Sequence, residues 1–203
     1  MDMTTNKKKN NTPLKSSITK EELRDLPLDY FKGNIMLVNS EETLKKAVEE
    51  IKKEKVWGFD TETKPSFKKG QTNKMALIQL ANNQKAFLFQ IKKTGLHPLI
   101  ASVLSDDNIT KIGLDIKQDL QKVREFVPNI ELKGFVDIQK VAKERGFKDL
   151  SLKKLAGIVL GVRISKRQQL SNWERKDLTP AQKRYAATDA WIAYLLYKKF
   201  YEK

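Results

Sequence analysis

The sequence predicts a mixed α/β fold, with one sheet that begins as an antiparallel meander, continues with parallel strands and carries helices on both faces. Apolar runs over 56–60, 75–80 and 86–89 are joined by short links, which is typical of antiparallel neighbours. From residue 97 onward, helical patterns alternate with short apolar runs, which indicates parallel strands with crossover helices. With 203 residues, the chain is long enough for one sizeable core.

Local patterns predict each element in turn. A short helix and lead-in over 21–33 precede a strand at 35–38, and Ser40 is a good N-cap for a helix that runs to residue 55. The later predictions are helices over 97–105, 116–126, 138–145, 151–160 and 180 to the C-terminus, with strands over 109–113 and 134–137. Residues 1–22 are polar and basic, so we expect a disordered tail before a single domain over 23–203.

Composition narrows the possible functions. Lys and Arg number 40 against 25 Asp and Glu, and a net charge of +15 favours a polyanionic partner over the alternative of a merely lysine-rich surface. The absence of cysteine excludes disulfides and zinc–thiolate sites. With His97 as the single histidine, most histidine-based metal sites and nucleophile triads are excluded too. Without a long apolar run or an apolar N-terminal segment, we expect a cytoplasmic protein that does not bind membranes.

Two acids follow the predicted strand at 56–60. Because side chains alternate along a strand, Asp60 and Glu62 share a face, with Cα atoms roughly 6.5 Å apart. Two carboxylates at the end of an apolar strand are costly unless a positive charge lies near them. A metal ion, an Arg or Lys pair, or solvent beyond Phe59 would each satisfy them.

The last predicted helix carries polar groups inward. Thr179 and Pro180 are typical of its beginning. Tyr185 and Asp189 lie on the same face as Ile192, which is apolar and so indicates that the face looks into the core. A buried Asp189 needs a partner, either a structural hydrogen bond or a cation shared with Asp60 and Glu62.

The helix predicted over 116–126 contains two further candidates. Asp115, with Gln118 three residues later, fits an N-cap arrangement, which we favour over a functional role. Asp119 lies one turn into the helix, at the edge of its apolar face, where either a core-facing or a surface position is possible.

These motifs together resemble the 3′–5′ exonuclease superfamily named for its four acids. Asp60-Thr61-Glu62 resembles the first motif, Gly113-x5-Asp119 the second and Tyr185-x3-Asp189 the third. Tyrosine at the third motif indicates the tyrosine subgroup, because Arg184 stands where the histidine subgroup carries histidine. Over roughly residues 30–203 the chain is similar to the Werner-syndrome exonuclease domain and its ribonuclease D-like bacterial relatives. In polymerase proofreading relatives, asparagine usually replaces Asp115.

The resemblance implies a ribonuclease H-like fold and a two-metal mechanism with Mg²⁺ or Mn²⁺. It implies that Asp60, Glu62 and Asp189 hold one ion, and that Asp60 bridges to a second ion held by Asp119. Tyr185 would orient the attacking water. The implied substrate is a DNA 3′ end, from which nucleoside 5′-monophosphates are released; protein partners are not predicted.

Other residues are candidates for binding the substrate: Thr61, Lys74 and Trp173, with Lys64, Lys68, Lys69, Arg163, Lys166 and Arg167 as further basic groups. For the lysines a solvated loop is an equal alternative, and for Trp173 we favour packing over stacking on a base. Two alternative functions remain: a ribonuclease D-like enzyme that trims RNA 3′ ends, and a non-catalytic nucleic-acid-binding module.

Overall fold

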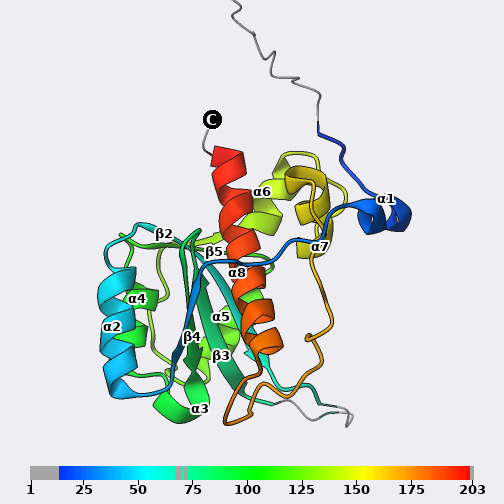
Figure 1. The fold of residues 1–203 in the computed structure, drawn as a ribbon. Helices are drawn as coiled ribbons and strands as arrows, with labels where there is room; N and C mark the ends of the chain where they lie inside the picture. Colours follow the sequence, from blue (N-terminus) through cyan, green and yellow to red (C-terminus); the bar gives the residue numbers. More distant parts are fainter. Residues whose placement is uncertain (1–13, 67–69, 71–72, 202–203) are drawn as a thin grey trace, which may run out of the picture.

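The computed structural model describes residues 14–66, 70 and 73–201, and its centre is one six-stranded sheet (Figure 1). The strands are β1 (Asn34–Val38), β2 (Val56–Thr63), β3 (Met75–Ala81), β4 (Lys85–Gln90), β5 (Thr110–Gly113) and β6 (Phe135–Asp137). Their order across the sheet is β1-β4-β3-β2-β5-β6. β2, β3 and β4 form an antiparallel meander, whereas β1 pairs parallel to β4, and β2, β5 and β6 are parallel neighbours. The predicted mixed sheet is confirmed.

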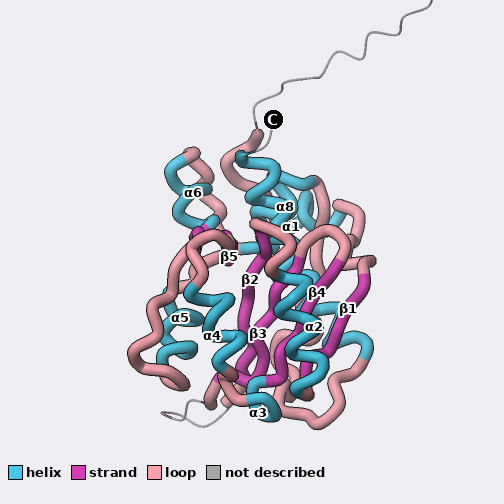
Figure 2. Tube along the Cα trace, turned by 90° about the vertical axis from the view of Figure 1, so that its left-hand side faces the viewer, coloured by secondary structure: helices cyan, strands magenta, loops and turns pink. Residues whose placement is uncertain are grey.

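Helices cover both faces of this sheet (Figures 1 and 2). They are α1 (Lys20–Asp25), α2 (Glu41–Ile51), α3 (Ile91–Thr94), α4 (Pro98–Ser105), α5 (Lys117–Arg124), α6 (Ile138–Glu144), α7 (Leu152–Leu155), the π-helical turn η1 (Ala156–Leu160) and α8 (Pro180–Tyr201). Apolar residues of α2, α4 and α5 pack with Trp57 and Phe59 in one core. Residues of α6, α7, η1 and α8 pack with Ile112 in another. Among the described residues, no helix has the combination of length and apolar character that a bilayer-spanning segment needs.

α8 lies directly against β2, and a glycine makes this approach possible. A Cβ atom added at Gly58 would lie 1.8 Å from the carbonyl oxygen of Ala190. The face of α8 that meets the sheet is correspondingly small, with buried Ala186, Ala187 and Ala190. Because Gly58, Asp60 and Glu62 share one face of β2, the contact at Gly58 brings α8 beside the two acids.

The N-terminal boundary differs from the prediction. Residues 20–22 begin α1, where Thr19 forms a capping box with Glu22. The backbone N–H of Ile18 also donates to Asp149, 2.9 Å away. The expected tail over 1–22 was therefore wrong for its last residues, because local capping and a long-range hydrogen bond attach them to the domain; residues 1–13 lie outside the described residues.

Two predicted helices also differ in detail. The helix begun by Ser40 ends at Ile51 instead of residue 55, with Lys52 as its C-cap. The helix predicted over 151–160 changes to π-helical geometry at Ala156. At Gly157 an added Cβ would meet the Cδ1 atom of Leu23 at 2.7 Å, so the missing side chain lets α1 pack onto this turn.

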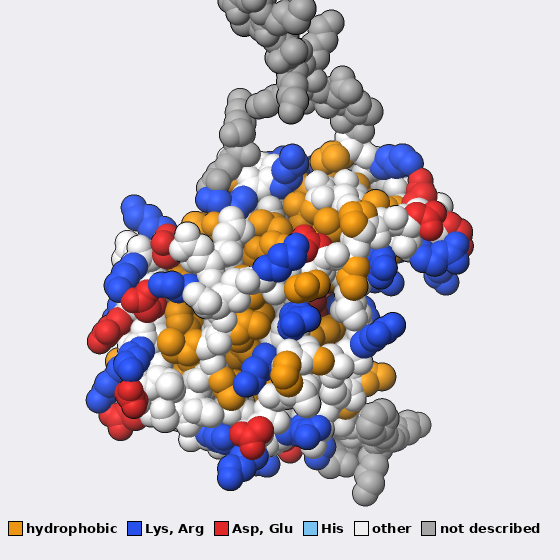
Figure 3. Space-filling model, viewed as in Figure 1, with side chains coloured by type: hydrophobic (Ala, Val, Ile, Leu, Met, Phe, Trp, Pro, Cys, Tyr) orange, Lys and Arg blue, Asp and Glu red, His pale blue; other side chains and the backbone are white. Residues whose placement is uncertain are grey.

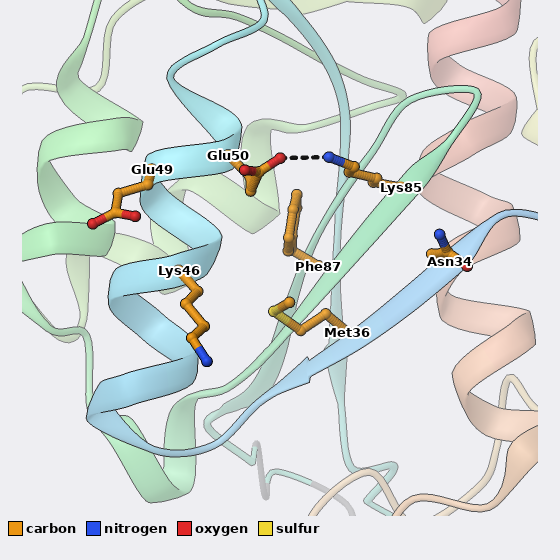
Figure 4. Close-up of a pocket in the computed structure, with 7 residues that line it drawn as sticks. All are labelled: Asn34, Met36, Lys46, Glu49, Glu50, Lys85 and Phe87. Atoms are coloured by element: carbon orange, nitrogen blue, oxygen red, sulfur yellow. Dashed lines mark hydrogen bonds and ion pairs between the residues drawn. The ribbon is translucent and has the colours of Figure 1, made fainter.

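A hollow of about 390 Å³ lies between part of α2 and the strands β1 and β4 (Figure 4). Met36 and Phe87 form its apolar floor, and charged residues surround it. At its edge, the ammonium of Lys85 donates to the carboxylate of Glu50. The carboxylate of Glu50 is thus balanced by lysines at the surface.

Candidate active site

Three carboxylates from two elements form a compact cluster at the contact between β2 and α8. One oxygen each from Asp60, Glu62 and Asp189 all lie within 4.8 Å of one another. Glu62 and Asp189 are buried and Asp60 is half-buried. The register between β2 and β3 shifts directly after Glu62, so the regular ladder is interrupted beside the acids. The structure therefore brings together the acids that the sequence assigned to one strand face and one helix face.

The cluster is electrostatically unfavourable by itself. Burial, and then the charges of Asp189 and Asp119, raise the pKa of Asp60 well above its ordinary value. Burial and the charge of Asp60 raise the pKa of Glu62 to about 10. Burial also raises the pKa of Asp189. Such mutual repulsion is relieved when a cation binds between the carboxylates.

The donor set fits a hard divalent cation. Carboxylate oxygens are the ligands that Mg²⁺ and Mn²⁺ prefer. Oδ1 of Asp189 is buried and has no hydrogen-bond partner of ordinary geometry among the described residues. An orphaned buried carboxylate oxygen is costly, and a metal ion would satisfy it.

Asp119 reaches the site from the opposite face of the sheet. It lies in the first turn of α5, half-buried, and accepts a hydrogen bond from the hydroxyl of Thr61. Burial raises its pKa, although the Thr61 hydrogen bond acts in the other direction. Asp119 is outside the group within 4.8 Å, but its charge raises the pKa of Asp60. Thr61 therefore links Asp119 to the strand that carries the cluster.

The predicted N-cap role of Asp115 was wrong. α5 begins at Lys117 with Ile116 as N-cap, and no side chain caps it. Asp115 is exposed and has a positive φ of 55°, a conformation that Asp tolerates better than most residues. Its backbone N–H donates to the carboxylate of Asp137, 3.0 Å away. This left-handed turn places the side chain of Asp115 outside capping geometry.

Tyr185 lies one helical turn before Asp189 and is buried against Trp173, with ring centroids 5.8 Å apart. Burial and the charges of Asp189 and Glu62 raise the pKa of its hydroxyl above the ordinary value. The hydroxyl therefore stays protonated in the neutral range and can donate a hydrogen bond at the cluster.

A family model described as 3′–5′ exonuclease matches residues 35–203. The chain belongs to this family. The bifunctional 3′–5′ exonuclease/ATP-dependent helicase WRN of Mus musculus is 36% identical over 151 residues, which cover 71% of this chain and 11% of the relative. The exonuclease mut-7 homolog of Homo sapiens is 32% identical over 165 residues, which cover 67% of this chain and 19% of the relative. The chain thus spans less than a fifth of the length of either relative.

Solved structures confirm the ribonuclease H-like fold. The Nibbler EXO domain of Aedes aegypti superposes with a TM-score of 0.73 at 24% identity, over 82% of this chain and 86% of that chain. Trypanosoma brucei RNase D, solved with RNA U12, superposes with a TM-score of 0.75 at 20% identity, over 85% of this chain and 64% of that chain. At these identities the likeness is one of fold.

The capping of α8 also organises the loop beside this exonuclease site. The predicted cap is present, because the hydroxyl of Thr179 accepts from the backbone N–H of Gln182 at 3.2 Å. The amide of Gln182 in turn donates to Ser171 at 3.0 Å and to the carbonyl of Asn172 at 3.1 Å. These contacts hold Trp173 against Tyr185.

The candidate substrate-binding residues have different surroundings. Trp173 is only 1% exposed and packs with Tyr185 in a buried cluster, which agrees with packing as its favoured role. Lys74 is exposed, with its ammonium 6.0 Å from the ring centroid of Phe126. Lys64 is also at the surface, 3.7 Å from Glu174. Thr61 is buried in its contact with Asp119, and Lys68 and Lys69 lie outside the described residues.

The basic residues at 163–167 do not form one track. Arg163 is structural, because its Nε donates to the carbonyl of Leu26 at 2.9 Å and its backbone bridges to Leu28. Lys166 instead enters the acid cluster, where Nζ lies 3.2 Å from Oδ2 of Asp189. The sequence placed Lys166 near the site but gave no sign of this contact, since it comes from an irregular loop with no periodicity.

Gln79 is a second residue that sequence reasoning missed. It pairs directly with Asp60 across β2 and β3, is fully buried, and both polar atoms of its amide lack hydrogen-bond partners among the described residues. The signal was present as one polar residue inside the apolar run of β3. Buried amides without partners are unusual, so Gln79 marks the floor of the site as polar.

Proposed function

We propose that this domain is a metal-dependent 3′–5′ exonuclease that hydrolyses the last phosphodiester bond of a DNA strand and releases nucleoside 5′-monophosphates. The cluster of Asp60, Glu62 and Asp189 carries this proposal, because three converging carboxylates suit metal-assisted hydrolysis. Membership of the exonuclease family and the excess of basic residues support it. Figure 3 shows Lys and Arg side chains spread across the face in view.

The acids divide into two sets of candidate ligands. Asp60, Glu62 and Asp189 would hold one Mg²⁺ or Mn²⁺, and Asp60 and Asp119 a second. When bound, two such ions supply an activated water and stabilise the departing 3′ oxygen. The hydrogen bond from Thr61 fixes the carboxylate of Asp119 for this purpose.

Tyr185 contributes orientation and not proton removal. Its hydroxyl stays protonated at neutral pH because its pKa is raised, so it is unsuited to act as a general base. Packing between Trp173 and the ring fixes the direction of the hydroxyl. A fixed donor next to Asp189 would align the attacking water with the scissile phosphate.

RNA is the alternative substrate. The resemblance of the motifs to the Werner-syndrome exonuclease branch argues for DNA as the substrate. The relative from Mus musculus, which belongs to that branch, shares 36% identity with this chain. The fold is equally that of Trypanosoma brucei RNase D, whose structure contains RNA U12. Surface lysines such as Lys74 would contact the phosphate backbone of either polymer.

A digestion experiment tests this function. Matched DNA and RNA strands, single-stranded or with a recessed 3′ end, would be incubated with Mg²⁺, with Mn²⁺ and with a chelator. We expect mononucleotides from DNA 3′ ends, no product with chelator and none from Asp60→Asn. Asp107→Asn, at an exposed acid far along the chain from the cluster, is the matched control and should retain activity. Undiminished cleavage by Asp60→Asn contradicts the metal assignment.

A further inference from the structure

The ammonium group of Lys166 occupies part of the acid cluster. Its Nζ lies 3.2 Å from Oδ2 of Asp189 and 5.7 Å from the centroid of the Tyr185 ring. The side chain of Asp189 is 5% exposed, whereas that of Lys166 is 34% exposed. The lysine therefore enters from the solvent side and contacts a carboxylate that belongs to the interior.

Lys166 is attached to the domain less firmly than the acids are. Asp60 and Glu62 lie on a central strand and Asp189 on a helix of 22 residues. Lys166 lies in the irregular segment between η1 and α8, just before a turn over 167–170 in which Leu170 is 70% exposed. A change in the rotamer of Lys166 can withdraw its ammonium without moving the sheet or α8.

The charge of Lys166 acts on all three acids. It lowers the pKa of Asp60, of Glu62 and of Asp189, but burial still keeps each pKa above its ordinary value, and the neighbouring carboxylates add to this effect at Asp60 and Glu62. One ammonium is therefore only partial compensation for three neighbouring carboxylates. A divalent cation would compensate more charge at the same place.

There is also space for the ammonium to move into. A cavity of about 460 Å³ adjoins the cluster, with Asp60, Lys166 and Asp189 in its wall. The cavity wall also includes polar Gln139, Ser151 and Gln169. A withdrawn ammonium would therefore keep polar and solvated surroundings.

We propose that Lys166 is the built-in counter-cation of the metal-free site, and that a divalent ion binds by displacing its ammonium from Asp189. The inference rests on the metal site of the proposed function and adds a competition within it. Metal affinity is then set by the acids together with the cost of releasing Lys166. Lys166 is a positioning residue for the metal ligands in this role, since it contacts a ligand and not the reacting atoms.

A Mn²⁺ titration of the full chain, after treatment with chelator and dialysis, tests the competition. We expect Lys166→Met to lower the apparent Kd for Mn²⁺ about ten-fold, in the range usual for linked binding events. Lys166→Arg keeps the charge and should bind Mn²⁺ more weakly than Lys166→Met. Lys153→Met removes the same charge from the wall of the same cavity and should change the Kd much less.

Thermal melting provides a second readout that a purely structural ion pair would not reproduce. Lys166→Met should lower the Tm in chelator, because Asp189 loses its counter-cation, but not in saturating Mn²⁺. An equal loss of Tm with and without Mn²⁺ overturns the proposal, as does an unchanged or raised Kd in Lys166→Met.

Wild-type protein and Asp60→Asn separate this inference from the function on which it rests. If the wild type does not bind Mn²⁺, or if Asp60→Asn binds it equally well, the metal site itself fails. If the wild type binds Mn²⁺, Asp60→Asn does not, and Lys166→Met matches Lys153→Met, only the competition by Lys166 is overturned.

Discussion

Glu50 and Glu62 are chemically identical, yet their surroundings shift their pKa values in opposite directions. Glu50 lies at the hollow between α2 and the outer strands, where hydrogen bonds from Lys53 and Lys85 lower its pKa to about 2 (Figure 4). Glu62 lies in the acid cluster, where burial and the charge of Asp60 raise its pKa to about 10. The surroundings thus stabilise the ionised form of the glutamate side chain at Glu50 and destabilise it at Glu62.

The difference shows where this fold tolerates imbalance of charge. Around α2, flexible lysines pair with Glu41, Glu42 and Glu50 at the surface, an arrangement that contributes little to stability. At β2 and α8, three carboxylates converge with one lysine among them. Unbalanced buried charge is maintained by the packing around it, and it is typical of functional sites.

The strongest test of this comparison exchanges each glutamate for glutamine. Glu62→Gln removes a cluster carboxylate, so nuclease activity should fall by more than the roughly 100-fold that loss of a supporting partner of a metal ligand usually causes. Glu50→Gln should leave kcat and KM unchanged and lower the Tm by only a few degrees. Both are measured by release of mononucleotides from a 3′-labelled strand. A comparable loss of activity in both variants would remove the functional distinction between the two regions.

The close contact of α8 with β2 is the next target. Gly58→Ala would place a Cβ atom 1.8 Å from the carbonyl oxygen of Ala190, so α8 must move away from the strand. We expect a loss of about 3 kcal/mol in the free energy of unfolding, measured in urea, together with loss of activity as Asp189 separates from Asp60. Full stability and activity in this variant would show that the cluster does not depend on this approach.

Removing the hydroxyl of Tyr185 should have a smaller effect. Tyr185→Phe keeps the ring packed against Trp173 but removes the donor beside Asp189. Turnover should fall about 10- to 100-fold, as for other supporting groups at metal sites, with KM nearly unchanged. Steady-state kinetics on one labelled strand measure both values. A collapse of binding with intact turnover is the result that contradicts a water-orienting role.

Lys111 is a buried basic group, so it tests whether burial shifts the pKa of a cation in the opposite direction to that of the buried acids. Its side chain is 0% exposed and donates to the carbonyl of Asp106 at 2.6 Å. Burial lowers its pKa to about 8, against about 10.4 in the unfolded chain. Between these pH values the unfolded chain binds more protons than the folded one, so this group makes stability rise as pH increases.

Lys111→Met removes this titration. The stability of the wild type relative to the variant should therefore increase from pH 8 to pH 10, in urea unfolding followed by circular dichroism. Lys117→Met, at an exposed lysine of α5, is the control and should show no such pH-dependent difference. Parallel stability curves for wild type and Lys111→Met would contradict the lowered pKa.

Much of the fold followed from local patterns in the sequence. The strands of the meander and the capped starts of α2 and α8 were predictable, because alternation, helical spacing and capping involve residues a few positions apart. The conformation of Asp115 was not predictable in this way, because its left-handed backbone is accompanied by a hydrogen bond from its N–H to Asp137 on β6, which is distant in the sequence. Residues 20–22 were assigned to the tail from composition, whereas Thr19 and a contact to Asp149 fix them to the domain.

The candidate site divides in the same way. By itself the sequence determined that Asp60 and Glu62 share a face of one strand and that Tyr185 and Asp189 share a face of one helix, since both periodicities are properties of the backbone. Only the tertiary structure decided that the two faces meet, which requires α8 to pass over Gly58. It also decided that Trp173 is buried and that Lys166 reaches Asp189, because both are carried by a loop whose path is set by contacts distant in the sequence.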